Sequence, residues 1–146
     1  MDDDSSQILV QMEIKNAALR HMTLSCQFGA HYSPTLVMES ANYALQICSG
    51  YDISYSSDSH VDTMERLLGI VQTAYTSLSF SSLDSANHTL QELLLHSIEL
   101  KLHHKNSAAA LELIEKGLQV LLPVYQKALW QKKLLILSSQ GTCLCY

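Results

Sequence analysis

Few residues in this chain can interrupt a helix, because its 146 residues include two prolines and five glycines. These two residue types are the strongest breakers of regular structure. Between them, apolar residues recur at spacings of three and four, which is the period of an α-helix and not the alternation of a β-strand. The sequence therefore predicts an all-α fold.

Capping residues predict where three of the helices begin. Ser33 precedes Pro34, and a serine at the cap with a proline at the first helical position is a typical helix start. Ser59, with Asp62 three residues on, forms a pattern related to the capping box. Asn106 is expected to cap a later helix that is rich in strong helix formers.

Two residues predict where helices end. Gly50 is expected to close one helix in the left-handed conformation, and Pro123 to block another. With these limits, the sequence predicts six helices, over about 6–27, 34–50, 59–78, 82–104, 107–122 and 124–137. The Ser-rich segment 51–60 is expected to be a loop. The other connections are short, so consecutive helices should be antiparallel and form three consecutive αα-hairpins.

Three hairpins can form a short α-solenoid, in which each hairpin leans on the next, or a closed helical bundle. We predict the solenoid and keep the bundle as the alternative. On the first helix the stripe expected to face the core is Val10, Ile14, Ala17, Ala18 and Met22. On the fourth it is Leu83, Ala86, Leu90, Leu93, Leu94 and Ile98.

A spaced set of residues in the last third of the chain favours repeat packing. The set consists of Ala110, Ile114, Gly117, Pro123, Trp130 and Gly141. It resembles the pattern of a tetratricopeptide repeat, with the helix-ending proline one residue late. Lys133 departs from the family, which has an aliphatic residue there. The resemblance spans about the last 50 residues, and it implies helical-repeat packing of the tetratricopeptide or HEAT kind.

One domain is expected, since 146 residues suffice for one hydrophobic core. We predict a single helical domain over 1–138 and a C-terminal tail over 139–146. Residues 1–7 are acidic where a signal peptide would be basic, and no run of about 18 apolar residues follows. The sequence thus argues against secretion and membrane spanning, and it predicts a cytoplasmic or nuclear protein. Cys143 and Cys145 are interpreted as incidental residues of the tail.

Charge is unevenly distributed along the chain. Through Glu99 there are twelve acidic residues against three basic ones, whereas from Leu100 onward six lysines oppose two glutamates, Glu112 and Glu115. Such a gradient can steer partners or stack neighbouring units head to tail. The simpler interpretation is a solvated, Lys-rich face. Charged residues make up only 16% of the chain, so part of the surface is expected to face a partner.

Histidine is abundant, with seven in the chain, and imidazole can serve as a metal ligand or a general base. His96 and His103 lie seven residues apart, which is two helical turns, so they share one helix face. No histidine pair at i, i+4 and no Cys-x-x-Cys motif accompanies them, so no metal site is expected. The chain also lacks a Gly-rich phosphate loop and a Gly-flanked nucleophilic serine, so no cofactor and no catalytic residue is predicted.

These features predict a non-catalytic protein-protein interaction or scaffold module. The alternative is a small helical enzyme or ligand-binding bundle, which would use His96 and His103 with a carboxylate in an internal cavity. Glu112 and Glu115 are more simply interpreted as solvent contacts on an exposed helix face.

The candidate partner-binding residues lie on the last helix and are Lys127, Trp130, Lys132 and Lys133. Trp130 would be an aromatic anchor and the lysines a basic rim. In the competing interpretation, Trp130 is buried and the lysines extend outward into solvent. A protein is the expected partner and a nucleic acid is not, because the only arginines, Arg20 and Arg66, are far from this end.

The end of the last predicted helix, Leu134–Leu137, is strongly apolar, although repeat arrays need a polar terminal unit. The chain is therefore expected to be a fragment or shortened isoform of a larger helical-repeat protein, or its last helix is expected to pack against another molecule. That molecule can be a second copy, which predicts self-association through this helix. The opposing interpretation is that the helix completes an ordinary core.

Overall fold

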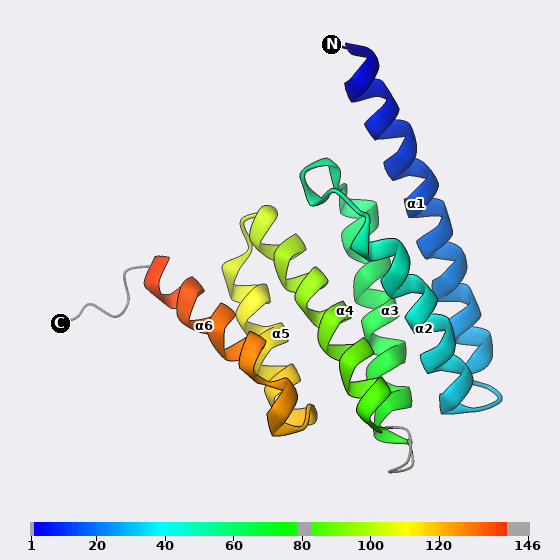
Figure 1. The fold of residues 1–146 in the computed structure, drawn as a ribbon, viewed down its shortest axis with the longest axis vertical. Coiled ribbons are helices and arrows are strands. Elements are labelled where there is room, and N and C mark those ends of the chain that lie inside the picture. The colour runs from blue at the N-terminus through cyan, green and yellow to red at the C-terminus, as the bar shows by residue number, and fades with distance from the viewer. Residues whose placement is uncertain (1, 79–82, 140–146) are drawn as a thin grey trace.

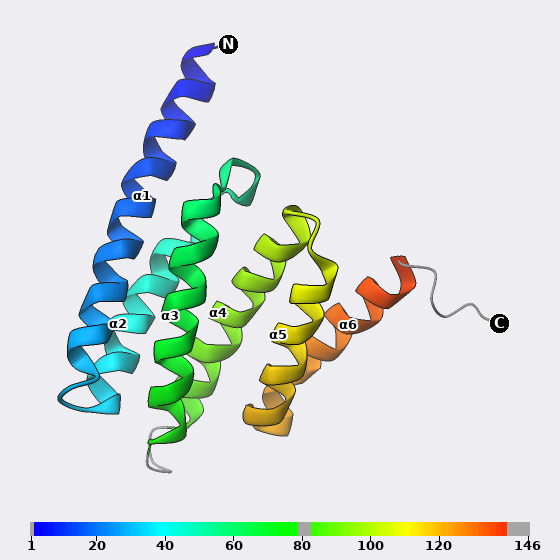
Figure 2. The ribbon, with the colours of Figure 1, turned by 180° about the vertical axis from the view of Figure 1, so that it is seen from behind.

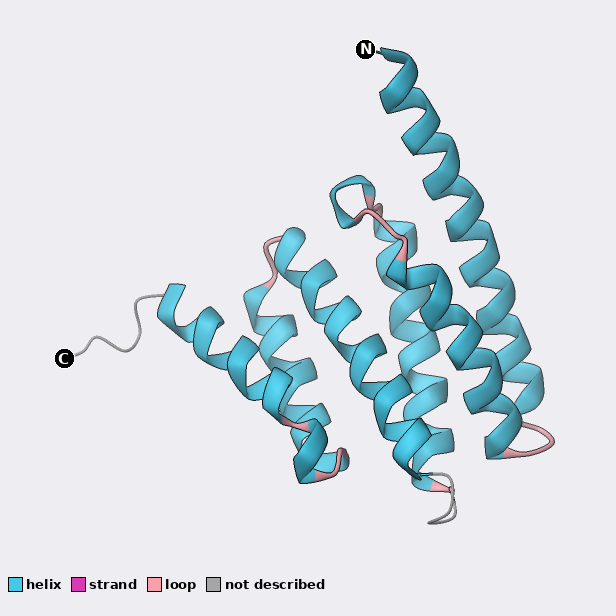
Figure 3. Cartoon of the chain, viewed as in Figure 1, coloured by secondary structure: helices cyan, strands magenta, loops and turns pink. Residues whose placement is uncertain are grey.

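The structure, a computed structural model, describes residues 2–78 and 83–139 (Figure 1). In these residues the regular structure consists of helices alone, and no strand is present (Figure 3). The α-helices are α1 (Asp2–Gly29), α2 (Pro34–Ser49), α3 (Asp58–Thr76), α4 (Leu83–His103), α5 (Ser107–Val120) and α6 (Lys127–Ser139). Two short 3-10 turns lie at Ile53–Tyr55 and Pro123–Tyr125. The predicted all-α fold is confirmed.

The helices pair as consecutive hairpins, with α1 against α2, α3 against α4, and α5 against α6. Each hairpin then packs on the next, because α3 contacts both α1 and α2, and α4 contacts both α2 and α5. Figures 1 and 2, which view the molecule from opposite sides, show α1, α3 and α5 in one layer and α2, α4 and α6 in the other. Since α1 and α6 lie at opposite ends, the array is open, as in a short solenoid.

Two of the predicted helix starts are confirmed by side-chain hydrogen bonds. The Ser33 hydroxyl accepts a hydrogen bond from the backbone N–H of Leu36 at 3.2 Å, with Pro34 at the first position of α2. The Asn106 side-chain oxygen accepts one from the N–H of Ala109 at 3.1 Å and caps α5. Each cap satisfies a backbone donor that has no partner within its helix.

One predicted helix start is wrong, and one correctly placed helix end has a different conformation from the expected one. The cap of α3 is Ser57 and not Ser59, because the Ser57 hydroxyl accepts the hydrogen bond from the N–H of His60. Ser59 already lies inside the helix, where its carbonyl accepts a hydrogen bond from the Thr63 hydroxyl. Gly50 does follow α2, but its φ of −103° is not left-handed, so the chain leaves the helix there without needing a glycine.

The C-terminal hairpin also differs slightly from the expected boundaries. Pro123 does end the preceding helix, but it opens a 3-10 turn, and α6 begins at Lys127 instead of residue 124. At the other end α6 includes Ser139, the first residue of the predicted tail. The rest of that tail, with Gly141, Cys143 and Cys145, lies outside the described residues.

Helix α1 buries a different stripe from the predicted one. The side chains that α1 buries are Met12, Asn16, Leu19, Thr23 and Cys26. By contrast, Val10 is 59% exposed and Ile14 is 63% exposed. Ala17, Ala18 and Met22 of the predicted stripe are half-buried, and Met22 packs against the edge of the core. The buried stripe keeps helical spacing but contains two polar residues, so a prediction based on hydrophobicity alone placed the centre of the core-facing stripe wrongly.

Helix α4 provides the centre of the core. Its fully buried side chains include Leu90, Leu93, Leu94 and Ile98, as predicted, with Ala86 nearly so; the side chain of Leu83 lies outside the described part. Gly117 lets α5 approach both α4 and α6 closely. A Cβ atom at Gly117 would lie 2.6 Å from a methyl carbon of Leu129 on α6 and 3.0 Å from one of Leu94.

Enlarging Gly117 should therefore destabilise the protein. We expect Gly117→Val to lower the free energy of unfolding by about 2–3 kcal/mol, because both leucines are fully buried and have little room to move. Gly69 on α3 is the matched control, since a Cβ there meets nothing within 4 Å. Gly69→Ala should raise the free energy of unfolding by about 0.5–1 kcal/mol through helix propensity. Urea denaturation measures both, and equal effects at the two glycines would contradict this account.

Candidate functional site

Helix α6 exposes several large apolar side chains at the end of the array. It buries Leu129 and Ile136, which are seven residues apart and face α5. Trp130 is 48% exposed, and Leu134 and Leu135 are each 64% exposed. The competing interpretation, in which Trp130 is buried, is therefore wrong. Large apolar side chains in contact with solvent gather here on one helix, which is the usual composition of a contact surface.

The lysines of α6 do not all extend freely into solvent. The ammonium group of Lys132 is paired with Glu99 of α4. That of Lys133 lies 2.6 Å from a carboxylate oxygen of Glu115 on α5, and 5.2 Å from the centre of the Trp130 ring. Glu115 is thus an ion-pair partner and not a simple solvent contact as predicted. These two pairs orient α6 on its neighbours, although exposed ion pairs add little stability.

Lys127, the remaining predicted contact residue, is exposed in the first turn of α6 and forms no ion pair with a described residue. It precedes Trp130 by three positions and Leu134 by seven, so the three side chains follow one face of the helix. The structure thus brings a free cation, an exposed tryptophan and an exposed leucine together in one row.

A second apolar surface lies at the opposite end of the array, in a groove of about 640 Å³ between α1 and α2. It is lined by Ile14, Ala18, Met22, Tyr43 and Ile47, together with two polar residues, Lys15 and Gln46. Ile14, Ala18 and Met22 are three of the residues predicted to face the core, so that stripe is the wall of an open groove instead. Tyr43 is 62% exposed. Sequence reasoning missed this groove because exposed and buried apolar stripes have the same period.

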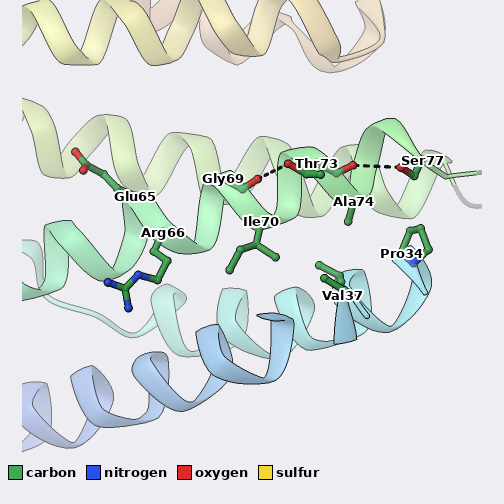
Figure 4. Close-up of a pocket in the computed structure, with 10 residues that line it drawn as sticks. Pro34, Val37, Glu65, Arg66, Gly69, Ile70, Thr73, Ala74 and Ser77 are labelled. Carbon is green, nitrogen blue, oxygen red and sulfur yellow. Dashed lines mark hydrogen bonds between the residues drawn. The ribbon is translucent and has the colours of Figure 1, made fainter. Parts of the chain in front are cut away.

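A third hollow, of about 500 Å³, lies between the start of α2 and the face of α3. Figure 4 shows Val37 of α2 opposite Ile70 and Ala74 of α3. Along α3, the Thr73 hydroxyl donates to the carbonyl of Gly69 at 3.0 Å, and the Ser77 hydroxyl lies 3.5 Å from the carbonyl of Thr73 (Figure 4). These hydroxyls bond to their own helix, and of the two charged residues that line the hollow, Glu65 is paired with Lys101 of α4 and Arg66 forms no ion pair with a described residue. The hollow therefore has a free guanidinium group at one end but no convergent set of polar groups of the kind that orients a small ligand.

The histidines meet in a combination that the sequence did not predict. His96 does not face His103, whose side chain is exposed beside the ring of His104. Instead, the Nε2 atom of His96 lies 3.0 Å from Nε2 of His60. The ring of Tyr51 stacks on His60 with centroids 3.9 Å apart. His60 is 36 positions from His96 and is the last residue of the predicted loop, although it lies in α3, so no local spacing could indicate this pair.

Burial keeps both of these imidazoles neutral. Burial lowers the pKa of His60 to about 3, and repulsion between its positive form and those of His96 and His104 lowers it further. Burial lowers the pKa of His96 to about 4. The Nδ1 atom of His60 has no hydrogen-bond partner among the described residues. Since both rings are neutral, one of the two Nε2 atoms carries the hydrogen of the bond between His60 and His96 and the other accepts it.

The histidine pair connects the first two hairpins. The Tyr51 hydroxyl donates to the side-chain oxygen of Asn16 on α1 at 2.8 Å, and the Tyr51 ring covers His60 of α3, which bonds to His96 of α4. Within the described residues, no group of three or more His, Cys, Asp or Glu side chains is arranged to hold a metal ion. Two hydrogen bonds and one ring stack thus connect α1 to α4 without a gap.

The two described cysteines are buried, and burial raises the pKa of the Cys26 thiol to about 11 and that of Cys48 to about 12. Both thiols are therefore protonated at neutral pH and are poor nucleophiles.

No helix of the described part is long and apolar enough to cross a membrane. Comparisons of the chain with models of known protein families, with curated proteins and with solved structures found no match.

Proposed function

We propose that this chain is a non-catalytic protein-interaction module of the helical-repeat kind, acting in the cytoplasm or nucleus, and that α6 carries its partner-binding face. The observation that carries the proposal is the exposure of Trp130, at 48%, one helical turn from Leu134, which is 64% exposed. Tryptophan is enriched at the centres of protein interfaces, where it contributes a large apolar area and an indole N–H.

Each contact residue has a distinct role in this proposal. Trp130 is the anchor, and Leu134 extends its apolar row by one helical turn. Lys127 supplies a cation for an acidic group on the partner. Lys132 and Lys133 act indirectly, because their pairs with Glu99 and Glu115 fix the orientation of the helix. This row suits the mode in which one helix lies in an apolar groove of another protein.

Site-specific crosslinking in cells tests the proposal. A photoreactive amino acid at Gln131, which is exposed next to Trp130, should give adducts with a partner protein. The same group at Thr76, exposed at the end of α3, is the control and should give none. Trp130→Ala should reduce the adduct yield about tenfold or more, as expected for an interface anchor. Adducts that are equal at both positions, or absent from Gln131, would contradict the proposal.

A further inference from the structure

Two adjoining hollows form one continuous surface along α3. The hollow of about 500 Å³ between α2 and α3 meets a second hollow of about 470 Å³ between α1 and α3, and Arg66 lines both. A single row of α3 side chains, at alternating spacings of four and three, follows the two hollows over about four turns. This surface, the α3 groove, is defined by Ser59, Thr63, Arg66, Ile70 and Thr73.

The two halves of the α3 groove differ in polarity. The half between α1 and α3 brings together the only two arginines of the chain, Arg20 of α1 and Arg66 of α3, beside the exposed hydroxyl of Ser59. Figure 4 shows Arg66 and Ile70 extending from the same side of α3. The half between α2 and α3 is mainly apolar, with a lining that includes Pro34, Val37, Ile70 and Ala74. The polar groups that this apolar half lacks on its own are therefore supplied by the half beside it.

The two guanidinium groups have no counterion among the described residues. Arg20 and Arg66 are exposed, and neither forms an ion pair with a described residue. Asp62 lines the same half but is paired with neither arginine, and the Glu65 carboxylate in the other half is paired with Lys101 of α4. The α3 groove thus has two unpaired cations against one unpaired carboxylate. Because the two like charges in one hollow repel each other, an anion placed between them is attracted by both.

We infer that the α3 groove binds an amphipathic organic anion, with its carboxylate or phosphate group between Arg20 and Arg66 and its apolar chain along Ile70. A guanidinium group binds either head group through two parallel hydrogen bonds. Ser59 lies in the first turn of α3, where the helix dipole favours negative charge. The apolar half, of about 500 Å³, is within the range of about 300–1,000 Å³ that is usual for small-molecule sites. No residue of α6 lines the α3 groove, so this binding activity goes beyond the proposed function and does not depend on it.

Isothermal titration calorimetry of the purified full chain tests the inference with two probes, decanoate and decyl phosphate, below the concentrations at which they form micelles. At least one should bind with a stoichiometry of one, and the tighter of the two identifies the head group. Along the series octanoate, nonanoate and decanoate, or along the matching alkyl phosphates, each added methylene should lower the Kd about two- to fourfold. No binding of either probe at up to about 1 mM overturns the inference.

Three further compounds separate the contributions of the charge and the chain. 1-Decanol has the chain without the charge, whereas acetate and inorganic phosphate have the charge without the chain. Each should bind at least about tenfold more weakly than the better probe, because hydrogen bonds to a charged group and the buried chain both contribute. Equal binding of 1-decanol would show that the arginines are not involved, and would contradict the inference.

Charge-removing variants locate the head group. Arg20→Gln and Arg66→Gln should each raise the Kd of the better probe about tenfold, because each removes a charged hydrogen-bond donor. Lys15→Gln is the matched control, since Lys15 is a cation of α1 that lines the separate groove between α1 and α2. It should change the Kd by less than about twofold, as expected for a charge outside the site. A loss of affinity in Lys15→Gln that equals the loss in the arginine variants would overturn the inference.

A second pair of variants locates the apolar chain. Thr73→Asp places a carboxylate beside Ile70 and Ala74, and it should raise the Kd more than about tenfold. Thr76→Asp adds the same charge to an exposed position of α3 that lines neither hollow, and it should change the Kd less than about threefold. Equal effects of the two changes would contradict the inference. Crosslinking at Gln131 is independent of the α3 groove, so a failure to bind either probe leaves the proposed function standing.

Discussion

Replacing Asn87 with leucine is expected to lower the free energy of unfolding by about 2–3 kcal/mol, because the backbone N–H of Leu122 loses its acceptor and the Tyr75 hydroxyl keeps only the carbonyl of Val120. Asn87 of α4 is fully buried. Its side-chain oxygen accepts hydrogen bonds from the Tyr75 hydroxyl at 3.1 Å and from the backbone N–H of Leu122 at 3.0 Å. Tyr75 lies on α3 and Leu122 lies between α5 and α6, so one amide joins the second hairpin to the third.

Chemical denaturation of three variants checks this prediction. His88→Ala changes an exposed neighbour of Asn87 and should alter stability by less than about 0.5 kcal/mol. Tyr75→Phe removes one of the two donors and should have an effect of about 1 kcal/mol. The double variant Asn87→Leu, Tyr75→Phe should then be less destabilised than the sum of the two single changes, because both changes remove the same hydrogen bond between Tyr75 and Asn87. Simple additivity would show that the two side chains are not coupled.

Acid should lower the free energy of unfolding of this protein at pH values at which ordinary carboxylates are still ionised. Burial lowers the folded-state pKa of His60 to about 3 and that of His96 to about 4, from 6.5 for a free side chain. Between these values the unfolded chain binds protons that the folded chain does not, so stability falls as the pH falls. Below about pH 6.5 the loss accumulates until the folded-state pKa values are reached, and by pH 4.5 we expect a loss on the order of 3 kcal/mol.

A pair of variants assigns this loss to the buried rings. His60→Phe keeps an aromatic ring beside Tyr51 but cannot be protonated, so its stability should change less between pH 7 and pH 4.5 than that of the wild type. His31→Gln removes an exposed histidine and should leave the wild-type pH profile unchanged. Urea denaturation at each pH gives the free energies. An unchanged profile in His60→Phe would mean that other groups cause the acid sensitivity.

Much of the fold could be predicted from sequence because its determinants are local. Caps such as Ser33 and Asn106 act within one turn, and the long row of leucines on α4 marks its core face by spacing alone. Helix α1 shows where this reasoning fails. Asn16 is buried because Tyr51, 35 residues away, donates a hydrogen bond to it. Thr23 is buried because its hydroxyl donates to the carbonyl of Leu19 at 2.8 Å. Hydrophobicity alone assigns both residues to the surface.

The candidate contact residues show the same limit. The sequence predicted that Trp130 and its lysines belong together on one helix, which follows from spacing alone. Whether Trp130 faces the core depends on how α6 rotates against α5, and the lysine pairs that orient it reach Glu99 and Glu115, 33 and 18 residues away. The groove on α1 and α2 depends likewise on which face of α1 the core accepts. Such tertiary choices leave no local pattern in the sequence.

The buried polar contacts also determine the curvature of the array. Apolar packing is non-directional, so hairpins held by it alone could rotate over one another at small cost. Hydrogen bonds and ring stacking act only over narrow angles. The contact from Asn16 through Tyr51 and His60 to His96 therefore sets the angle of the first joint, and the bonds of Asn87 set the angle of the second. Each contact between consecutive hairpins therefore has its own buried polar groups, and the superhelical twist of the described array follows from these two angles.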